Sequence, residues 1–334
     1  MDFISRSFYL VMAVAGLLFC GVAQSATYSY DALGRVVSIQ YENGTKVTYG
    51  YDSMGNRTET DIKQGTGSGG PDTFFAVLSV PSSVGRPAIN LRSLANRRGY
   101  DGTETARITF IVPEDAIVVG EGGTESFPDG GVAIDTGDWP ESLGNELTLK
   151  VSGKVYGGGG AGGNEAVKGN RTVYTGGDGG ASIVLRTKLN VKIEEGGEIK
   201  GGGGGGGSGA SSGVWRPMSP ITLFNTHAGG AGGGGFPNGK AGHADRPGVF
   251  GTMAKDGTTS GGGRGSIALL RGGDKSPNGH GGKGGAAARP GGPGQASLEG
   301  YAGAAGGAAG AALETNGNNY SITNRGVLEG ARRY

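Results

Sequence analysis

The sequence predicts a mostly β protein that contains a bundle of polyglycine-II helices. A small N-terminal β-hairpin segment and a small attachment domain, made of a short helix plus strands, are expected to precede the bundle. Three observations support this fold class: 76 of the 334 residues are glycine, a tyrosine-containing repeat lies near the N-terminus, and a strand-like template occurs three times. Glycine usage is several times the average of about 7%, so glycine is the unusual component of this chain.

The first 25 residues have the features of a secretory signal peptide. Arg6 supplies a weak positive charge, and Phe8–Phe19 form an apolar run that is too short to span a bilayer. Ala23 and Ser25 are small residues at the positions required for cleavage after Ser25. The alternative interpretation is a short buried helix. Cys20 follows the bulky Phe19, which disfavours lipid attachment, so we expect this cysteine to be removed with the signal.

The mature chain is expected to be exported and to lie outside the cell or at its surface. It would contain no cysteine and hence no disulfide, because Cys20 is the only one in the sequence. Thirty basic residues nearly balance 29 acidic ones, so no field of one sign indicates nucleic acid as a partner. No other apolar stretch is long enough to predict a membrane span.

Residues 26–62 contain an internal repeat, "YSYDALGRV" followed by "YGYDSMGNR". Each copy places alternating aromatic and β-branched residues beside a glycine turn, a pattern typical of strand–turn–strand. Asn43-Gly44 adds a strong hairpin signal. The segment resembles the YD repeats of the Rhs and teneurin families. Two copies cannot enclose anything, so we expect a short hairpin cap or attachment segment.

A Gly/Ser linker is expected at 63–73, and the attachment domain at 74–156. Apolar residues at helical spacing predict a helix that ends at Gly99; they are Ile89, Leu91, Leu94 and Ala95. The stretches "ARITFIVP", "AIVVGE" and "NELTLKVSGKVYG" predict strands.

A nine-residue template recurs at 149–157, 193–201 and 322–330. The three copies, "LKVSGKVYG", "IEEGGEIKG" and "ITNRGVLEG", share the pattern apolar-x-x-x-Gly-x-apolar-x-Gly. The first two lead directly into glycine runs and the third closes the chain. We therefore predict related strands at a common base, from which glycine segments leave and to which they return.

The glycine-rich region, 157–334, is predicted to be a bundle of polyglycine-II helices with a C-terminal closing strand. Such helices make no internal hydrogen bonds, so each backbone group must pair with a neighbouring helix. A flexible tether and another ordered form are the alternatives. Blocks of nearly pure glycine alternating with segments that carry Trp and Phe favour the bundle over a solvated chain. The expected structural glycine core is Gly202, Gly203, Gly204, Gly205, Gly206, Gly207, Gly232 and Gly233.

Over residues 74–334 the order of strands, "G-x-I-x-G" entry and glycine blocks resembles the glycine-rich adhesins at the tips of bacteriophage tail fibres. The "NLRSLANRRGYDG…ITFIVP" segment is similar to the module that precedes those tips. The resemblance implies a sandwich of glycine helices whose connecting loops bind receptors. This chain differs in its signal peptide and YD repeats, which indicate a cell-exported relative.

The order of glycine blocks predicts which inserts lie far from the base. If the block at 201–209 leaves the base, 210–228 is distal, 236–260 returns near the base, and 266–278 is distal again. Exposed aromatic and arginine side chains are the usual anchors of recognition. The predicted receptor-binding residues are Trp215, Arg216, Phe224, His227, Leu270 and Arg271. Alternatively, these apolar groups pack against each other and close the bundle ends.

No enzyme chemistry is predicted. His227, His243 and His280 lack metal-ligand spacing, and Asp135 and Asp138 are more typical of solvated turn caps than of a calcium site. No phosphate-binding loop or nucleophile elbow occurs, so no cofactor or metal is expected.

The first functional hypothesis is an exported adhesin that binds a cell-surface protein or glycan. The alternative is a self-associating structural protein of a matrix or filament, with contacts through glycine bundles or the N-terminal hairpin. A third hypothesis is ice binding, against which the long and chemically varied inserts argue.

Overall fold

The computed structural model describes residues 26–41, 45–52, 54–63, 73–165, 173–210, 231–232, 234–243, 253–266, 279–297 and 300–333. The chain divides into two compact units, Met1–Phe75 and Ala76–Tyr334. The expected signal peptide and nearly all of the expected linker therefore lie outside the described residues. No helix in the described part is long and apolar enough to cross a membrane.

The first unit contains a four-stranded antiparallel sheet in the order β1-β2-β3-β4. Its strands are β1 (Ala26–Tyr30), β2 (Val36–Tyr41), β3 (Lys46–Tyr51) and β4 (Arg57–Lys63). The expected hairpin segment is thus a sheet of two successive hairpins joined by the β2–β3 pair.

The aspartate and glycine of the repeat build the turn of each hairpin. The Asp31 carboxylate accepts the backbone N–H groups of Leu33 and Arg35, both at 2.9 Å, and Asp52 accepts that of Asn56 at 2.8 Å. Backbone hydrogen bonds from Arg35 lower the pKa of Asp31 although burial opposes this. The repeat's glycines have positive φ (77° and 90° at 34 and 55), a conformation that glycine adopts without strain. The turn chemistry therefore explains the Y-x-Y-D-x-x-G spacing.

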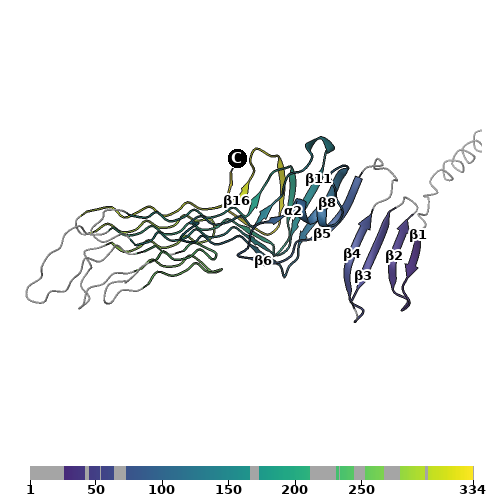
Figure 1. Ribbon diagram of the computed structural model, residues 1–334, viewed down its shortest axis with the longest axis horizontal. Helices are drawn as coiled ribbons and strands as arrows, with labels where there is room; N and C mark the ends of the chain where they lie inside the picture. The colour runs from purple at the N-terminus through teal and green to yellow at the C-terminus, as the bar shows by residue number, and fades with distance from the viewer. Residues whose placement is uncertain are drawn as a thin grey trace, which may run out of the picture. The chain divides into compact units, whose positions relative to one another are not determined.

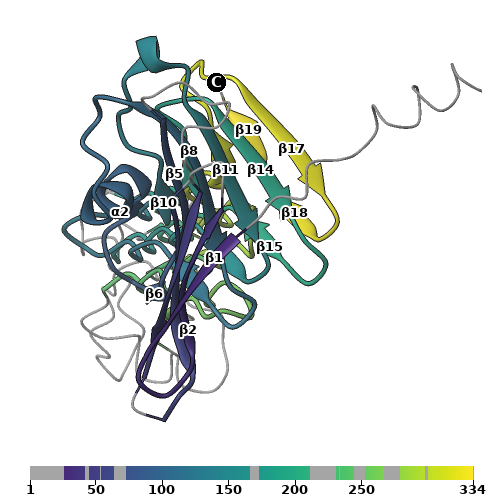
Figure 2. The same cartoon turned by 90° about the vertical axis from the view of Figure 1, so that its right-hand side faces the viewer.

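The second unit contains three parallel sheets of five strands each. Every strand pairs with the strand three positions later in the chain, so the backbone winds through the three sheets in turn and forms a β-solenoid of five coils (Figures 1 and 2). The first sheet holds β5 (Thr73–Ser79), β8 (Thr105–Val112), β11 (Glu146–Val151), β14 (Leu189–Ile193) and β17 (Tyr320–Asn324). The second holds β6 (Ser83–Val84), β9 (Ile117–Val119), β12 (Lys154–Tyr156), β15 (Glu198–Lys200) and β18 (Val327–Glu329). The third holds β7 (Ile89–Asn90), β10 (Ile134–Asp135), β13 (Ile183–Val184), β16 (Ala311–Glu314) and β19 (Ala331–Arg333).

Apolar side chains stack in rows inside the solenoid. Phe110 pairs with Leu149, Leu149 with Val191, and Val191 with Ile322. The first three are at most 1% exposed, whereas Ile322 in the last coil is half-buried. Alternation of inward apolar and outward polar residues, clearest in β8, fixes this register because a one-residue slip would turn every apolar side chain outward.

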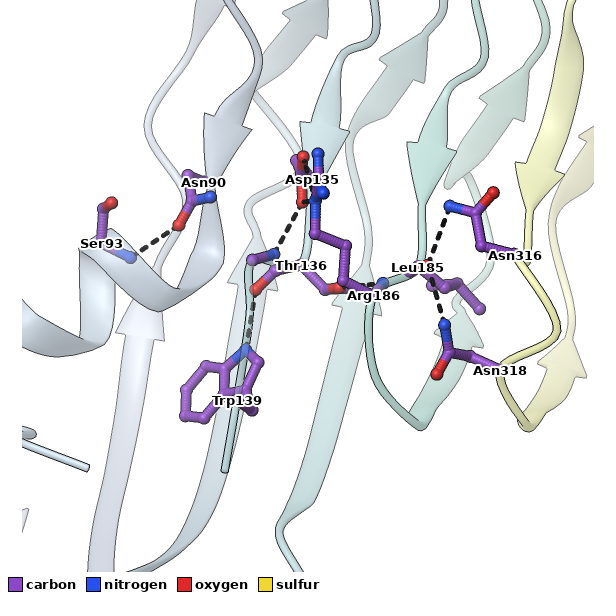
Figure 3. A network of polar contacts seen from close by, with 10 residues as sticks. Asn90, Ser93, Asp135, Thr136, Trp139, Leu185, Arg186, Asn316 and Asn318 are labelled. Carbon is purple, nitrogen blue, oxygen red and sulfur yellow. Dashed lines mark hydrogen bonds and ion pairs between the residues drawn. The ribbon is translucent and has the colours of Figure 1, made fainter. Parts of the chain in front are cut away.

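The corner that follows the third sheet is held by polar side chains (Figure 3). Asn90 accepts the Ser93 N–H at 2.8 Å and caps helix α2 (Leu91–Arg97). In the next two coils, Arg186, which follows β13, donates to Asp135 in β10 at 2.9 Å. A 3₁₀ turn, η1 (Glu141–Leu143), precedes β11. The expected helix is present, but Ile89 belongs to strand β7 and is not helical.

The recurrent template marks the corner between the first and second sheets. Val155 pairs with Ile199, which pairs with Leu328, so the second apolar position stacks in all three copies. The first apolar position differs: Leu149 lies opposite Val191, not Ile193, because the middle copy has two more residues between its strands. The shift is even, so the same face stays inward. The prediction of related strands at a common base is confirmed, with this correction of register.

The template's first glycine is required by the stacking of the coils. A Cβ atom on Gly153 would lie 2.1 Å from the Pro113 carbonyl oxygen of the preceding coil, and one on Gly197 would lie 2.2 Å from that of Val151. Real Cβ atoms do not approach backbone so closely, so the corners can nest only where glycine is present.

The glycine-rich segments leave the solenoid between its second and third sheets. They follow β9, β12 and β15, and each excursion returns to the next strand of the third sheet, β10, β13 or β16. Solenoid strands and glycine segments therefore alternate along the chain, and Ala76–Tyr334 form one compact unit. The structure thus differs from the expected division between residues 156 and 157.

In the excursions, every third residue of a segment forms its backbone hydrogen bond with the same neighbouring segment. Gly202, Gly205 and Ser208 donate to the carbonyls of Gly180, Gly177 and Tyr174. The next residues in phase, Gly204, Gly207 and Ala210, donate to Arg289, Gly292 and Gln295. Gly203, on the third face, donates to Phe236, so three faces of one segment meet different neighbours. Figure 1 shows the elongated bundle beside the sheets.

Segment 201–210 is enclosed by six others. From Gly202 to Ala210 its hydrogen-bond partners lie in 157–163, 173–180, 231–236, 279–285, 289–297 and 300–310. The predicted glycine core, Gly202 through Gly207, is buried here, as is Gly232, whereas Gly233 lies outside the described residues. A Cβ on Gly205 would meet the Ala161 carbonyl oxygen at 1.8 Å. Backbone atoms, not side chains, form this interior.

On one surface segment of the bundle, exposed residues recur at every third position. In 301–310 the exposed residues are Ala302, Ala305 and Ala308, while Ala304, Gly307 and Gly310 are buried. The sequence as a whole has no strict three-residue repeat, but the structure shows a local one on the outer face of a surface segment. Nearly pure glycine marks the interior segments.

Candidate functional site

The candidate site is the end of the bundle far from the solenoid. All six residues predicted to bind a receptor lie outside the described residues: Trp215, Arg216, Phe224, His227, Leu270 and Arg271. The structure does describe the residues that directly precede and follow those stretches.

The residues that border the two predicted binding stretches are bonded to each other or to a shared segment. Gly279 donates to the carbonyl of Ala210 at 2.9 Å, and Ser266 donates to that of Ala231 at 2.9 Å. Gly281 in turn donates to Ser266 at 3.1 Å. The chain therefore enters and leaves both 211–230 and 267–278 at one end of the bundle.

Two further stretches open at the same end. Glu165 donates through its backbone N–H to the carbonyl of His243 at 2.9 Å, and these two residues border 166–172 and 244–252. The Asn164 side chain accepts the His243 N–H at 2.9 Å and donates to Glu125 at 2.9 Å. Four stretches of sequence are thus gathered by backbone pairing of their flanks.

The base of the bundle rests on aromatic packing. Phe236 packs against Tyr156 at a ring-centroid distance of 5.4 Å and belongs to a buried cluster with Val119. Ala287 packs on the same cluster, and the Ala288 N–H donates to Gly201. Residues 236 and 287 are therefore points where the chain returns to the solenoid, as expected for 236.

The expectation that all of 236–260 lies near the base needs correction. After Phe236, residues 239–243 leave the base again, since Lys240 pairs with Gly123 and His243 with Glu165. Residues 253–257 run back, and Thr258 pairs with Gly261 in a tight turn. Sequence blocks of glycine marked some segments but not 239–243 and 253–257, in which two and one of the five residues are glycine and no two glycines are adjacent.

The junction of solenoid and bundle contains the most perturbed side chains. The Tyr156 hydroxyl donates to Glu198 at 2.5 Å, and Lys200 lies 2.9 Å from the same carboxylate. Burial, with the hydrogen bond to Glu198, raises the pKa of Tyr156 well above its ordinary value. Burial opposes the ionisation of Glu198, but hydrogen bonds from Tyr156 and Lys200 outweigh it and lower its pKa. Of these groups, Tyr156 also contacts the bundle, through its ring packing on Phe236.

Chemistry for metal binding is not assembled by the described residues. They contain no group of three or more His, Cys, Asp or Glu side chains that could hold a metal ion. Burial lowers the pKa of His280, which favours its neutral form. Asp135, one of the two carboxylates considered as a calcium ligand, is paired with Arg186.

The sequence matches the profile of the phage tail fibre adhesin Gp38 family over residues 76–333. The chain belongs to this family. An RHS repeat profile matches residues 30–66, which include most of the N-terminal sheet. Family membership indicates a receptor-binding, non-enzymatic adhesin with an extracellular or virion-associated location.

Among solved structures, the chain is similar to the gp37-gp38 adhesin tip complex of the bacteriophage S16 long tail fiber. The identity is 21%, the match covers 76% of this chain and 81% of that chain, and the TM-score is 0.43. No curated protein matches the chain.

Proposed function

We propose that this Gp38-family adhesin recognises a cell-surface protein or glycan through the loops at the far end of its glycine bundle. The observation that carries the proposal is the convergence of the loop flanks: Ala210 with Gly279, Ser266 with Ala231, and Glu165 with His243. Loops held at both ends on a fixed lattice lose little conformational entropy on binding, which favours affinity. Trp215, Arg216, Phe224, His227, Leu270 and Arg271 supply the aromatic and cationic side chains that commonly dominate recognition.

We propose that the glycine segments are polyglycine-II helices. The support is the three-residue period of their hydrogen bonds, since this helix has three residues per turn and bonds only to its neighbours. The close approach of backbones, such as that of Gly205 to Ala161, agrees with it and allows Cα–H···O contacts. A diffraction or spectroscopic measurement that found α-helical or β-sheet backbone angles at 201–210 would contradict this assignment.

The tip is tested by paired substitutions and binding to bacterial envelopes. Trp215→Ala and Phe224→Ala should each weaken binding roughly 30-fold, the effect of removing an aromatic anchor worth about 2 kcal/mol. Phe127→Ala is the matched control, because Phe127 is 79% exposed on a described loop of the same unit. It should leave binding unchanged.

Each variant should keep slow amide exchange at Gly202–Gly207, which reports an intact bundle. Unchanged envelope binding by a folded Trp215→Ala variant would refute the placement of the receptor site. Loss of binding by all three variants alike would show that the bundle surface in general, and not the tip, is responsible.

We also propose that the chain is exported, with cleavage after Ser25, on the pattern of its first 25 residues. The mass of the protein recovered outside the cytoplasm measures the cleavage site directly. A chain that keeps its first 25 residues in the cytoplasm would contradict export.

The four-stranded N-terminal sheet is proposed to attach the adhesin to a larger fibre. Its few buried side chains support this role: Tyr28 and Tyr30 in β1 are 50% and 59% exposed, and among the strands that the structure describes β1 is paired on one side only. Deleting residues 26–62 should abolish copurification with the fibre while envelope binding by the isolated chain persists. Filaments of the isolated chain that require this segment would instead favour self-association.

A further inference from the structure

The side of the glycine bundle carries a shallow hollow whose lining includes none of the predicted binding residues. It is lined by Ala254, Lys255, Asp256, Thr258, Gly262, Gly263, Arg264 and Lys283. The lining comes from three surface segments that lie next to each other. The backbone N–H of Lys255 donates to the carbonyl of Arg264, and that of Gly284 donates to the carbonyl of Gly263. Three cationic side chains are thereby brought to one place, Lys255 and Arg264 from the two arms of one tight turn and Lys283 from a later segment.

These three cations are exposed and have no acidic partner in the described part of the chain. Lys255, Arg264 and Lys283 form neither an ion pair nor a side-chain hydrogen bond there. The one carboxylate of the hollow, Asp256, is already engaged by Lys240 at 3.0 Å and by the Ala241 N–H at 2.8 Å. The hollow therefore presents an excess of positive charge.

Part of the lining is glycine backbone. Gly262 and Gly263 contribute no side chain, and the space that a Cβ would fill at each is occupied by the carbonyl oxygens of Gly284 and Lys255. Within the described residues, the N–H groups of Gly262 and Arg264 donate no hydrogen bond. Backbone donors beside cationic side chains are a combination that suits phosphate oxygens.

We propose that this hollow binds the phosphate groups of a phosphorylated glycan of the bacterial envelope. The lining has no aromatic side chain on which nucleic-acid bases could stack. It also has no large apolar side chain to insert into a lipid layer. The choice of an envelope glycan rests on the proposed receptor-recognition function. The site would add a charge-driven contact along the flank of the bundle to the recognition at its tip.

The test uses the full-length protein and a phosphorylated lipopolysaccharide core oligosaccharide, with its phosphatase-treated form as the comparison. At low salt, Lys255→Ala/Arg264→Ala/Lys283→Ala should weaken binding of the phosphorylated form about tenfold or more, and raised salt should weaken wild-type binding. The matched control is Lys188→Ala/Lys192→Ala/Arg332→Ala, which removes the same charge from exposed positions on the solenoid. This control should change binding by less than about threefold.

Three outcomes would overturn the proposal. They are equal binding of the two oligosaccharides, equal losses in both triple variants, and equally strong binding to phosphatidylglycerol vesicles. The Trp215→Ala variant separates this site from the tip, because it should keep full affinity for the oligosaccharide while losing envelope binding. If Trp215→Ala keeps both oligosaccharide affinity and envelope binding, the assignment of the tip is wrong, whereas the proposal for the hollow is unaffected.

Discussion

The solenoid and the glycine bundle belong to one compact unit, but side-chain packing stabilises the solenoid and backbone hydrogen bonding stabilises the bundle. In the solenoid, rows such as Phe110, Leu149 and Val191 bury apolar side chains between three sheets. In the bundle, segment 201–210 buries almost only backbone, and its hydrogen bonds go to six neighbours. Solenoid stability therefore follows apolar area, whereas bundle stability depends on satisfying every backbone group and on the absence of Cβ atoms.

The largest effect is expected from adding a side chain to the bundle interior. Gly205→Val would place its Cβ 1.8 Å from the Ala161 carbonyl oxygen, and backbone on all sides cannot move aside. We expect more than about 5 kcal/mol of destabilisation and loss of the bundle. In the wild type the amides of Gly202–Gly207 should resist hydrogen exchange; in the variant they should exchange at once.

A valine side chain placed on the bundle surface instead of in its interior provides the control. Ala305 is exposed on segment 300–310, so Ala305→Val should change stability by less than about 0.5 kcal/mol. Rapid exchange at Gly202–Gly207 in the wild type would mean that the segment is a tether. Equal damage from both substitutions would mean that the surface is as tightly packed as the interior.

The sequence predicted structure correctly at positions where only one type of residue can meet the physical requirement. The recurrent template predicted the stacked strands because an inward apolar residue and a nesting glycine are both required at each corner. The order of the blocks placed Phe236 at the base. It could not reveal 239–243 and 253–257, because surface segments need glycine only on their inward faces and resemble ordinary loops in sequence.

The cationic hollow shows the other limit of the sequence. Lys255 and Arg264 lie on the two arms of the turn at Thr258–Gly261, whereas Lys283 comes from a later segment that only backbone pairing brings beside them. A three-residue spacing of single side chains among glycines is the signal that could have marked their segments as surface ones, as it does for Ala302, Ala305 and Ala308. Which segments become neighbours depends on the whole lattice.

A smaller effect is expected from truncating a solenoid side chain. Phe110 is fully buried and stacks on Leu149 and, edge to face, on Trp139 at 6.4 Å. Phe110→Ala should cost about 3–5 kcal/mol through lost apolar burial and a residual cavity. Chemical denaturation measures this loss, and Val77→Ala, at an exposed position of β5, should cost far less. A bundle that loses exchange protection before the solenoid unfolds would show that the two regions unfold separately.

The smallest effect is expected at the junction and depends on pH. Because the folded-state pKa of Tyr156 is raised, mainly by burial, the hydroxyl stays protonated when folded but ionises near pH 10 when unfolded. Stability from this group is complete below pH 10 and falls above it, by at most about 1.4 kcal/mol per pH unit. Tyr156→Phe keeps the stacking on Phe236 but removes the titrating hydroxyl, so it should reduce the alkaline slope of unfolding free energy. Tyr301→Phe, at a half-buried surface position, is the comparison. An alkaline slope that is unchanged in Tyr156→Phe would mean that folding does not raise the pKa of this hydroxyl.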